Sequence, residues 1–429
     1  MPDIRPGHWV RYAGRANLST VACPPYDVID EAQHAALEAA DPHNFVRLIL
    51  PRAAPGEAAE ARYRRARTLL DEWLSSGVLA EDDRPSVLAV EQAFDDHGTP
   101  RVRRGLFALL ALSEFAEGRV LPHERTLSGP KQDRLGLLDA VGAQLSPIFV
   151  LYPDAENAVV ASLADVFAAA PSHEAVLGGI KHRAWRIADP SRVSALTGLL
   201  AGRTGYIADG HHRYETALAY RRLSRERGVP VDGTPRDAIP AFLCGMSDPG
   251  LVIFPTHRLV HSLSFDPAKL ESGLERFFDV RTPAADDRAT VQEALAEAGR
   301  DRPAFALVEG TRPVRLLALK ADAPLHEVVA LPTHEALRLL DVSVLHAVVL
   351  EHLLGMSRLS QERQENLRYS KDFDQAVREA REGRAQLAFL LNSTRMDDVR
   401  RVCESGEVMP QKSTFFYPKI IDGFALQRL

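Results

Sequence analysis

The chain has 429 residues, which at roughly 150 residues per domain is enough for two or three domains with substantial cores. Lys and Arg number 52 against 58 Asp and Glu, so the net charge of −6 excludes an overall basic field that would attract nucleic acid or an anionic membrane. The 3 cysteines are far apart in the sequence, and neither a secretory signal nor a bilayer-length apolar run is visible. We therefore expect a cytoplasmic protein of mixed α/β class with reduced thiols.

The first half of the chain predicts alternating helices and strands after an extended opening loop. Pro24 and Pro25 restrict the backbone before Tyr26 and Asp27, because proline limits its own conformation and that of the residue before it. Apolar spacing then predicts, in chain order, a helix over 30–40, a helix over 57–76, a hairpin over 86–112, a strand over 147–152, a helix over 155–170 and a strand over 181–187.

The segment 206–218 is the most informative part of the sequence. A short apolar strand ends at Asp209, Gly210 permits a tight turn, and apolar spacing predicts that a helix begins near His211. The free N–H groups and positive dipole end of that helix favour an anion, and Arg213 adds a bidentate donor. The alternative is a structural role, in which the two histidines cap the helix and pair with neighbouring carboxylates.

The second half predicts a further α+β region and a tail. We expect a boundary near residue 264, a second α+β domain over 265–391, and a tail over 392–429 that returns to the site. The expected elements are a hairpin over 241–260, a helix over 267–278, a hairpin over 304–320, a helical stretch over 333–354, a strand over 387–391, a helix over 396–405 and a strand over 414–421.

Three further polar clusters accompany the 206–218 segment. Each cluster alone is typical of a solvated surface or an internal salt bridge, but together they suit polyanion binding with general-base chemistry. A charged pair inside the apolar run at 256–260 is costly unless it faces a cleft. The clusters comprise His123, Glu124 and Arg125; His257 and Arg258; and Lys412, Ser413, Thr414 and Lys419.

Several other chemistries lack their sequence signatures. No GxxxxGK[ST] motif, no GxGxxG between a strand and a helix, no HExxH and no GxSxG occur. His211 and His212 are adjacent, so on a helix they point about 100° apart and do not readily share one ion. Mg²⁺ needs few protein ligands, and Asp209 is a candidate ligand for it.

Five motifs in this order resemble the domain of unknown function 1015 family over nearly the whole chain. They are Pro24-Pro25-Tyr26-Asp27-Val28-Ile29, His123-Glu124-Arg125-Thr126, Asp209-Gly210-His211-His212-Arg213-Tyr214, Thr256-His257-Arg258 and Pro410-Gln411-Lys412-Ser413-Thr414. The Asp209 motif is also similar to the corresponding turn of the archaeal ADP-dependent free serine kinases, which have a ParB/sulfiredoxin-like fold. This resemblance implies a ParB/sulfiredoxin-like nucleotide-binding core with large insertions, covering 1–264.

The resemblance implies a phosphotransferase that moves phosphate between a nucleotide, ADP or ATP, and a small hydroxyl metabolite such as free serine. Glu124 matches the catalytic base of the kinases, and Asp209, with Mg²⁺, and His211 would complete the catalytic set. Gly210, His212, Arg213, Thr216, His123 and Arg125 would hold the nucleotide. The expected substrate or anion ligands are Tyr26, Asp27, His257, Arg258, Lys412, Ser413, Thr414 and Lys419.

Two other functions stay open at the level of sequence. A ParB-like nucleotide-binding switch or partitioning-related protein would use the same turn, although the net charge and the diluted basic cluster at 221–227 disfavour nucleic acid as a partner. A metal-assisted phosphohydrolase would use the His and Asp clusters. The expected partner is a small-molecule substrate, and a homodimer is also a candidate assembly.

Overall fold

The computed structural model describes residues 3–14, 16–58, 60–126 and 128–429. They form two compact units. The first holds the described residues of Met1–Pro122, Thr126–Val252 and Pro418–Leu429, and the second holds His123–Arg125 and Ile253–Tyr417. The chain therefore passes between the units repeatedly, and the predicted functional regions 1–264, 265–391 and 392–429 stay predictions.

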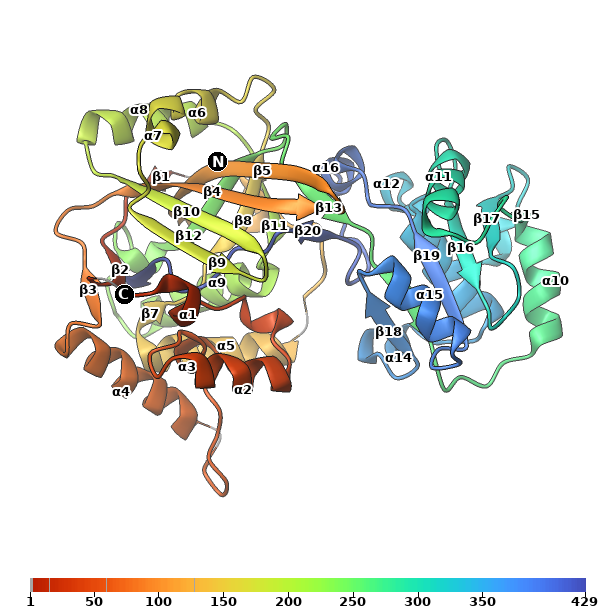
Figure 1. Ribbon diagram of the computed structural model, residues 1–429, viewed down its shortest axis with the longest axis horizontal. Helices are drawn as coiled ribbons and strands as arrows, with labels where there is room; N and C mark the ends of the chain where they lie inside the picture. The colour runs from red at the N-terminus through yellow and green to blue at the C-terminus, as the bar shows by residue number, and fades with distance from the viewer. Residues whose placement is uncertain (1–2, 15, 59, 127) are drawn as a thin grey trace. The chain divides into compact units, whose positions relative to one another are not determined.

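A nine-stranded mixed sheet is the framework of the first unit (Figure 1). Its strands are β1 (Ile4–Arg5), β4 (Val87–Asp96), β5 (Thr99–Ala111), β6 (Val120–Leu121), β8 (Ile148–Tyr152), β9 (His173–Leu177), β10 (Ile180–Ile187), β11 (Gly205–Asp209) and β12 (Ala238–Gly245). They follow the order β6-β11-β8-β12-β5-β4-β10-β9, with β1 on β5. The pairs β11–β6 and β12–β8 are parallel, and the other pairs are antiparallel.

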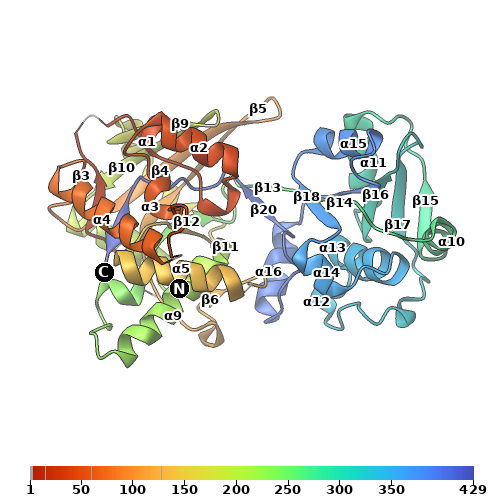
Figure 2. The same ribbon diagram turned by 90° about the horizontal axis from the view of Figure 1, so that it is seen from below.

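Helices cover this sheet and a smaller one. The helices are α1 (Leu18–Val21), α2 (Glu31–Ala40), α3 (Val46–Ile49), α4 (Ala61–Ser75), α5 (Ser128–Val141), α6 (Ala158–Ala161), α7 (Ala164–Ala168), α8 (Pro190–Leu200) and α9 (His211–Glu226). Apolar side chains of α6, α8 and α9 share one core with the large sheet. Helices α5 and α9 lie side by side (Figure 2).

A second core of the first unit surrounds a four-stranded sheet. Its strands are β2 (Trp9–Tyr12), β3 (Leu79–Glu81), β7 (Ala143–Gln144) and β21 (Leu426–Arg428), in the order β3-β2-β21-β7. Apolar residues of α1, α3, α4 and α5 pack against it. The last residues of the chain thus complete a sheet that the first residues begin.

Most elements predicted for this unit are present, with two corrections. Asp30 caps α2 by accepting from the Gln33 amide, and β4 and β5 form the expected hairpin. The helix predicted over 155–170 is broken into α6 and α7. The hairpin predicted over 241–260 is wrong, because β5 and β8 occupy both edges of β12.

The second unit contains a six-stranded sheet in the order β15-β17-β16-β19-β14-β18. These strands are β14 (His257–Val260), β15 (Phe278–Arg281), β16 (Ala304–Val308), β17 (Arg315–Leu319), β18 (Leu367–Ser370) and β19 (Leu387–Leu391). The hairpin predicted over 304–320 is the antiparallel pair β16–β17. Two short strands, β13 (Val252–Phe254) and β20 (Phe415–Tyr417), form a separate pair.

Helices cover both faces of the six-stranded sheet. They are α10 (Pro267–Phe277), α11 (Arg288–Ala298), α12 (Glu335–Arg338), α13 (Asp341–Val344), the π-helix η5 (Leu345–Leu353), α14 (Arg358–Arg363), α15 (Phe373–Arg381) and α16 (Met396–Glu404). Helices α11 and α15 share one core with the sheet. The single helical stretch predicted over 333–354 is instead α12, α13 and the π-helix.

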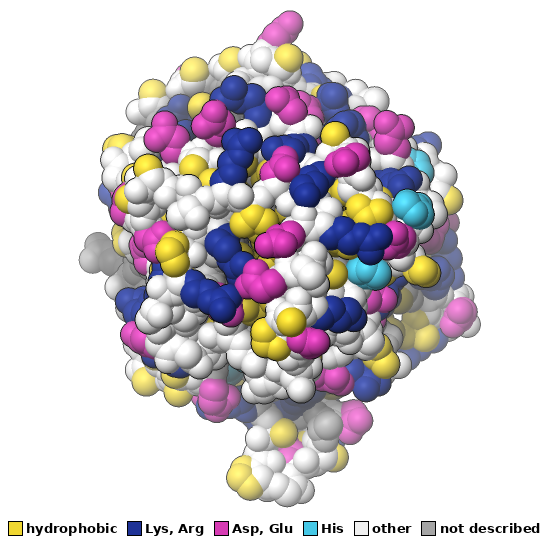
Figure 3. All heavy atoms as spheres, turned by 90° about the vertical axis from the view of Figure 1, so that its right-hand side faces the viewer, with side chains coloured by type: hydrophobic (Ala, Val, Ile, Leu, Met, Phe, Trp, Pro, Cys, Tyr) yellow, Lys and Arg dark blue, Asp and Glu magenta, His cyan; other side chains and the backbone are white. Residues whose placement is uncertain are grey.

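The mixed α/β class predicted from the sequence is confirmed by both units. Figure 3 shows basic and acidic side chains intermingled over one face of the molecule. Within the described ranges, no helix combines the length and apolar character that crossing a bilayer requires.

Candidate functional site

The five sequence motifs fall into two groups, one in each unit. Residues 24–29 and 209–214 lie in the first unit with Lys419, whereas 123–125, 256–258 and 410–414 lie in the second. Each group is assembled from segments that are far apart in the chain.

In the first unit, Gly210 forms a turn that only glycine adopts easily. Strand β11 ends at Asp209, and Gly210, with φ of 91° and ψ of 28°, precedes the first residue of α9. A β-carbon at this position would lie 2.8 Å from Cγ2 of Ile148. Left-handed backbone and close packing together account for the glycine. The predicted strand–turn–helix is therefore present.

Two cations hold the carboxylate of Asp209. Lys419 donates to Oδ1, and the Arg213 guanidinium donates to Oδ2 at 2.5 Å. Arg213 also donates to the Pro147 carbonyl. Burial alone would raise the pKa of Asp209, but Lys419 and Arg213 outweigh it and hold the pKa well below its usual value. Asp209 is thus permanently ionised, and the C-terminal tail does reach this turn.

The opening loop contributes to the same cluster. Tyr26 is half-buried, with the Arg134 guanidinium 4.3 Å from its ring centroid. Burial raises the pKa of Tyr26, and the positive charge of Arg213 partly opposes that rise. Asp27 is exposed and, after Asp209, helps to raise the pKa of Arg213 against the effect of burial. Both predicted residues therefore lie within electrostatic range of Arg213.

The first turn of α9 carries the remaining predicted residues of this group. His211 is buried, His212 is half-buried, and Thr216 is buried one turn later. The Thr216 hydroxyl has no hydrogen-bond partner among the described residues. A cavity of about 500 Å³ lies against this side of α9, lined in part by Thr216 and Glu215.

Asp422 belongs to this cluster, although sequence reasoning missed it. Its Oδ2 accepts from the Ser146 hydroxyl at 3.0 Å, while Oδ1 is buried without a partner among the described residues. Burial raises the pKa of Asp422 to about 8, against the opposing effect of Arg213. Asp422 is therefore mostly protonated at neutral pH. The one local signal was the Asp-Gly turn at 422–423, where Gly423 has φ of 103°.

In the second unit, the segments 123–125 and 410–414 lie side by side. The His123 ring nitrogen Nε2 is 2.8 Å from Oγ1 of Thr414, and the Lys412 amide donates to Oε1 of Glu124 at 2.9 Å. The Arg125 guanidinium is 3.8 Å from Glu362. Two motifs 280 or more residues apart are thus joined by side-chain contacts.

Arg258 extends from the neighbouring strand β14 and is only 1% exposed. Its Nε donates to His346 at 3.1 Å, and its NH2 group contacts the Gln411 carbonyl at 3.5 Å. No carboxylate of a described residue lies within ion-pair distance of it. His257 is buried and accepts from the Leu391 amide, and burial followed by the charge of Arg258 lowers its pKa to about 4. His257 is a neutral core residue.

The donors of the first group do not fit a resident metal ion. Both oxygens of Asp209 already accept hydrogen bonds from cations. Across the described part of the chain, no three His, Cys, Asp or Glu side chains come together in a metal-binding arrangement. The predicted Mg²⁺ ligation by Asp209 therefore finds no support in this geometry.

The basic cluster on α9 is largely neutralised by nearby acids. Arg221 pairs with Glu114 and Asp237, and two further pairs join α9 residues to exposed carboxylates. Those pairs are Arg225–Asp232 and Arg227–Asp139. Paired arginines offer little charge to a phosphate backbone. The partitioning-related alternative gains no support from this helix.

Fold and site define a mixed α/β protein with a buried charge cluster at a strand–turn–helix corner. The chain belongs to the family described as "Protein of unknown function (DUF1015)", whose model matches residues 4–343. No curated protein matches the chain.

Solved structures show only distant similarity. A free serine kinase variant in complex with AMP has a TM-score of 0.36 and 13% identity, covering 72% of this chain and 86% of that chain. A conserved hypothetical protein from Pyrococcus furiosus has a TM-score of 0.35 and 14% identity, with 74% and 93% covered. SbnI from Staphylococcus aureus, with a C-terminal truncation, has a TM-score of 0.35 and 10% identity, with 74% and 85% covered.

Proposed function

We propose that the protein is a nucleotide-dependent phosphotransferase that acts on a small hydroxyl metabolite, with free serine as the first acceptor to test. The observation that carries the proposal is the turn at Gly210, where the N-terminus of a 16-residue helix meets a buried cluster of Asp209, Arg213 and Lys419. Unpaired N–H groups at a helix N-terminus bind phosphate.

The charges of this cluster favour an anion. Arg213 and Lys419 carry two positive charges against the single negative charge of Asp209. Asp422 adds little negative charge at neutral pH, because burial raises its pKa to about 8. Asp27 is exposed, so solvent screens its charge more strongly. The buried part of the corner is therefore net positive, as a phosphate site requires.

In the proposed reaction the residues of the corner position charge and Glu124 moves a proton. The acceptor hydroxyl oxygen forms a bond to the transferred phosphorus while the bond to the nucleotide bridging oxygen breaks, and the nucleotide leaves with that electron pair. Glu124 takes the hydroxyl proton. Asp209 is too acidic to serve as this base, so its role is to position Arg213 and Lys419.

The remaining predicted residues are assigned by the unit in which they lie, which moves His211 from the catalytic set to the nucleotide and moves His123 and Arg125 from the nucleotide to the acceptor. His211, His212 and Thr216 would face the nucleotide from the first turns of α9. His123, Arg125, Lys412, Ser413 and Thr414 would position Glu124 and the acceptor, supported by the contacts of Glu124 with Lys412 and of His123 with Thr414. Mg²⁺ would enter as part of the nucleotide substrate and would need no resident site in the protein.

The test compares Glu124→Gln with the wild-type chain. We expect the substitution to reduce phosphate transfer from ADP or ATP to serine by about 10²–10⁴-fold, because a positioned base contributes that much. Nucleotide binding, measured by calorimetry, should be unchanged. Glu327→Gln, which alters a half-buried partner of Arg276 in the same unit as Glu124, is the matched control.

Three results would contradict the proposal. Absence of nucleotide binding to the wild-type chain would show that the Gly210 turn is not a phosphate site. Full transfer activity in Glu124→Gln would show that Glu124 is not the general base. Loss of nucleotide binding in that variant would show that Glu124 has a structural role.

A further inference from the structure

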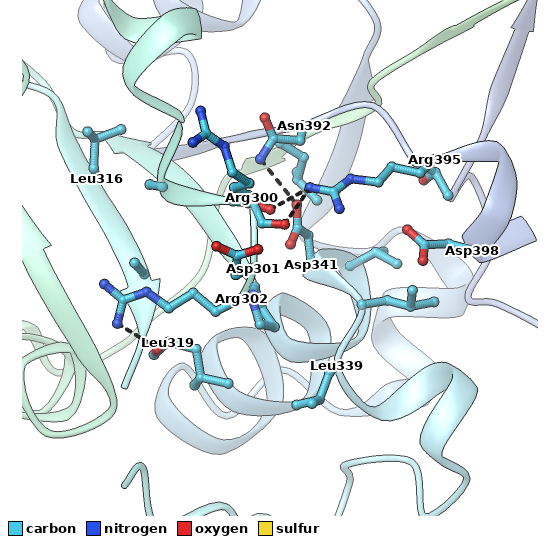
Figure 4. Close-up of a pocket in the computed structure, with 18 of the residues that line it drawn as sticks. Arg300, Asp301, Arg302, Leu316, Leu319, Leu339, Asp341, Asn392, Arg395 and Asp398 are labelled. Atoms are coloured by element: carbon cyan, nitrogen blue, oxygen red, sulfur yellow. Dashed lines mark hydrogen bonds between the residues drawn. The ribbon is translucent and has the colours of Figure 1, made fainter. Parts of the chain in front are cut away.

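The second unit contains a cavity of about 1070 Å³, and of its lining the proposed function uses only Ser413. It lies where the ends of β16, β17 and β19 meet the C-terminus of α11 and the start of α16. Figure 4 shows Asp341, Asn392 and Arg395 together in its wall. The volume is at the upper end of the roughly 300–1,000 Å³ range of pockets for drug-sized ligands. A free amino acid would fill only a small part of it.

The lining of this cavity has a surplus of positive charge. Basic side chains outnumber acidic ones by eight to five. Two of the basic residues are paired within the lining, Arg302 with Asp279 and Arg401 with Asp398. The unpaired basic residues therefore exceed the unpaired acids. Such a lining attracts small anions.

Arg395 is held in place by backbone oxygens and has no acidic partner. Its NH2 group donates to the carbonyls of Gly299 at 2.8 Å and Arg300 at 3.0 Å. Within the described ranges, no carboxylate lies within 4 Å of it. The nearby Asp341 instead accepts from the Ala304 amide and from Asn392. The guanidinium is thus fixed, and its charge is not neutralised by an ion pair.

Arg258 is the deepest cation that lines the cavity. Its hydrogen-bond and ring contacts are neutral, namely His346, backbone carbonyls and the Tyr369 ring, whose centroid is 5.2 Å from the guanidinium carbon. The negative charge of Glu124 also acts on Arg258, without an ion pair between the two described residues. Burial lowers the pKa of Arg258 to about 10, so the side chain stays charged at neutral pH. A buried charge without a counterion is costly, and an oxyanion from solution would offset that cost.

The π-helix explains why Arg258 has a neutral partner. His346 lies on this π-helix, and its Nδ1 is 2.7 Å from Oε1 of Gln361 while Nε2 accepts from Arg258. Burial, followed by the charge of Arg258, lowers the pKa of His346 to about 3. A neutral histidine orients the guanidinium without cancelling its charge. Irregular π-turns of this kind are frequent at functional sites.

We propose that this cavity binds a small polyanion, a metabolite with two or more carboxylate or phosphate groups, with Arg258 and Arg395 as its anchoring cations. The inference does not rest on the phosphate site at Gly210, because every lining residue belongs to the second unit. Citrate represents the carboxylate class, and inorganic pyrophosphate represents the phosphate class.

The experiment titrates each anion into the full chain by calorimetry and locates the contact by hydrogen exchange. We expect at least one anion to bind and to protect the segments 299–304 and 391–398. Arg258→Gln and Arg395→Gln should each weaken binding by at least about tenfold, because each removes a charge-assisted hydrogen bond. Arg276→Gln, which removes a cation of the same unit outside the cavity, should bind like the wild type.

Every outcome bears on the proposal. Binding of citrate alone or of pyrophosphate alone supports it and identifies the anion class. Binding of neither anion overturns it, and so does protection confined to 209–216, since that pattern places the anion at the Gly210 turn. Arg395 is exposed, so Arg395→Gln is expected to fold even if Arg258→Gln does not, and unchanged affinity in Arg395→Gln also overturns the proposal.

Discussion

The two units contain buried cations in opposite electrostatic settings. In the first unit, Arg213 and Lys419 share one carboxylate, Asp209. In the second unit, Arg258 is more deeply buried and contacts a neutral histidine, carbonyl oxygens and an aromatic ring. Two cations that share one carboxylate are held in place by it and keep one net positive charge between them. A buried cation that is left unmatched retains its attraction for an anion that arrives from solution.

The largest effect should come from removing the shared carboxylate. We expect Asp209→Asn to lower the free energy of unfolding by about 3–5 kcal/mol, because Arg213 and Lys419 would stay buried without a counterion. Chemical denaturation measures the loss. Asp139→Asn, which removes an exposed partner of Arg227, should cost no more than about 1 kcal/mol. If Asp209→Asn cost no more than Arg258→Gln, the contrast between the two settings would be wrong.

A smaller effect should come from the turn that places this cluster. Gly210→Ala would put a β-carbon on a left-handed residue and 2.8 Å from Ile148. We expect the free energy of unfolding to fall by about 1–3 kcal/mol. Gly198→Ala in α8 is the matched control, since a β-carbon there meets no atom within 4 Å and alanine favours a helix. Equal stability of Gly210→Ala and the control would show that the turn is relaxed.

The smallest effect concerns the protonated carboxyl group beside Arg213. Burial raises the pKa of Asp422 to about 8, whereas in the unfolded chain the pKa is about 3.9. Between these values the folded state holds a proton that the unfolded state has lost, so stability contributed by Asp422 falls as pH rises. From pH 6 to 7 the free energy of unfolding of the wild type should fall by up to about 1.4 kcal/mol relative to that of Asp422→Asn. Parallel pH profiles of unfolding for the two chains would contradict this assignment.

The local structures were predictable where a single segment determines them. Asp30 caps its helix, and Gly210 separates strand from helix, because capping oxygens and positive φ are local properties. The hairpin predicted over 241–260 failed because its first strand has both edges occupied by distant strands. The residues of 241–260 alone do not indicate that distant strands pair with both edges of β12.

The sequence could not predict which motifs lie together in one unit. Nothing in the sequence near Glu124 indicates that it accepts a hydrogen bond from the Lys412 amide, because the contact joins segments 288 residues apart. Asp422 was missed for the same reason, since its raised pKa depends on burial beside Arg213. The role of Glu124 as the general base of the reaction stays a prediction. The family model matches residues 4–343, which confirms the family that the motifs indicated.

The path of the chain has a consequence for biosynthesis. Residues 418–429 supply strand β21 and Lys419 to the first unit, although the whole of 253–417 is translated before them. Before residues 418–429 are synthesised, the four-stranded sheet of the first unit lacks β21, and Asp209 lacks Lys419 as one of its two cations. The first unit therefore completes its fold only after residues 418–429 have been synthesised and have left the ribosome.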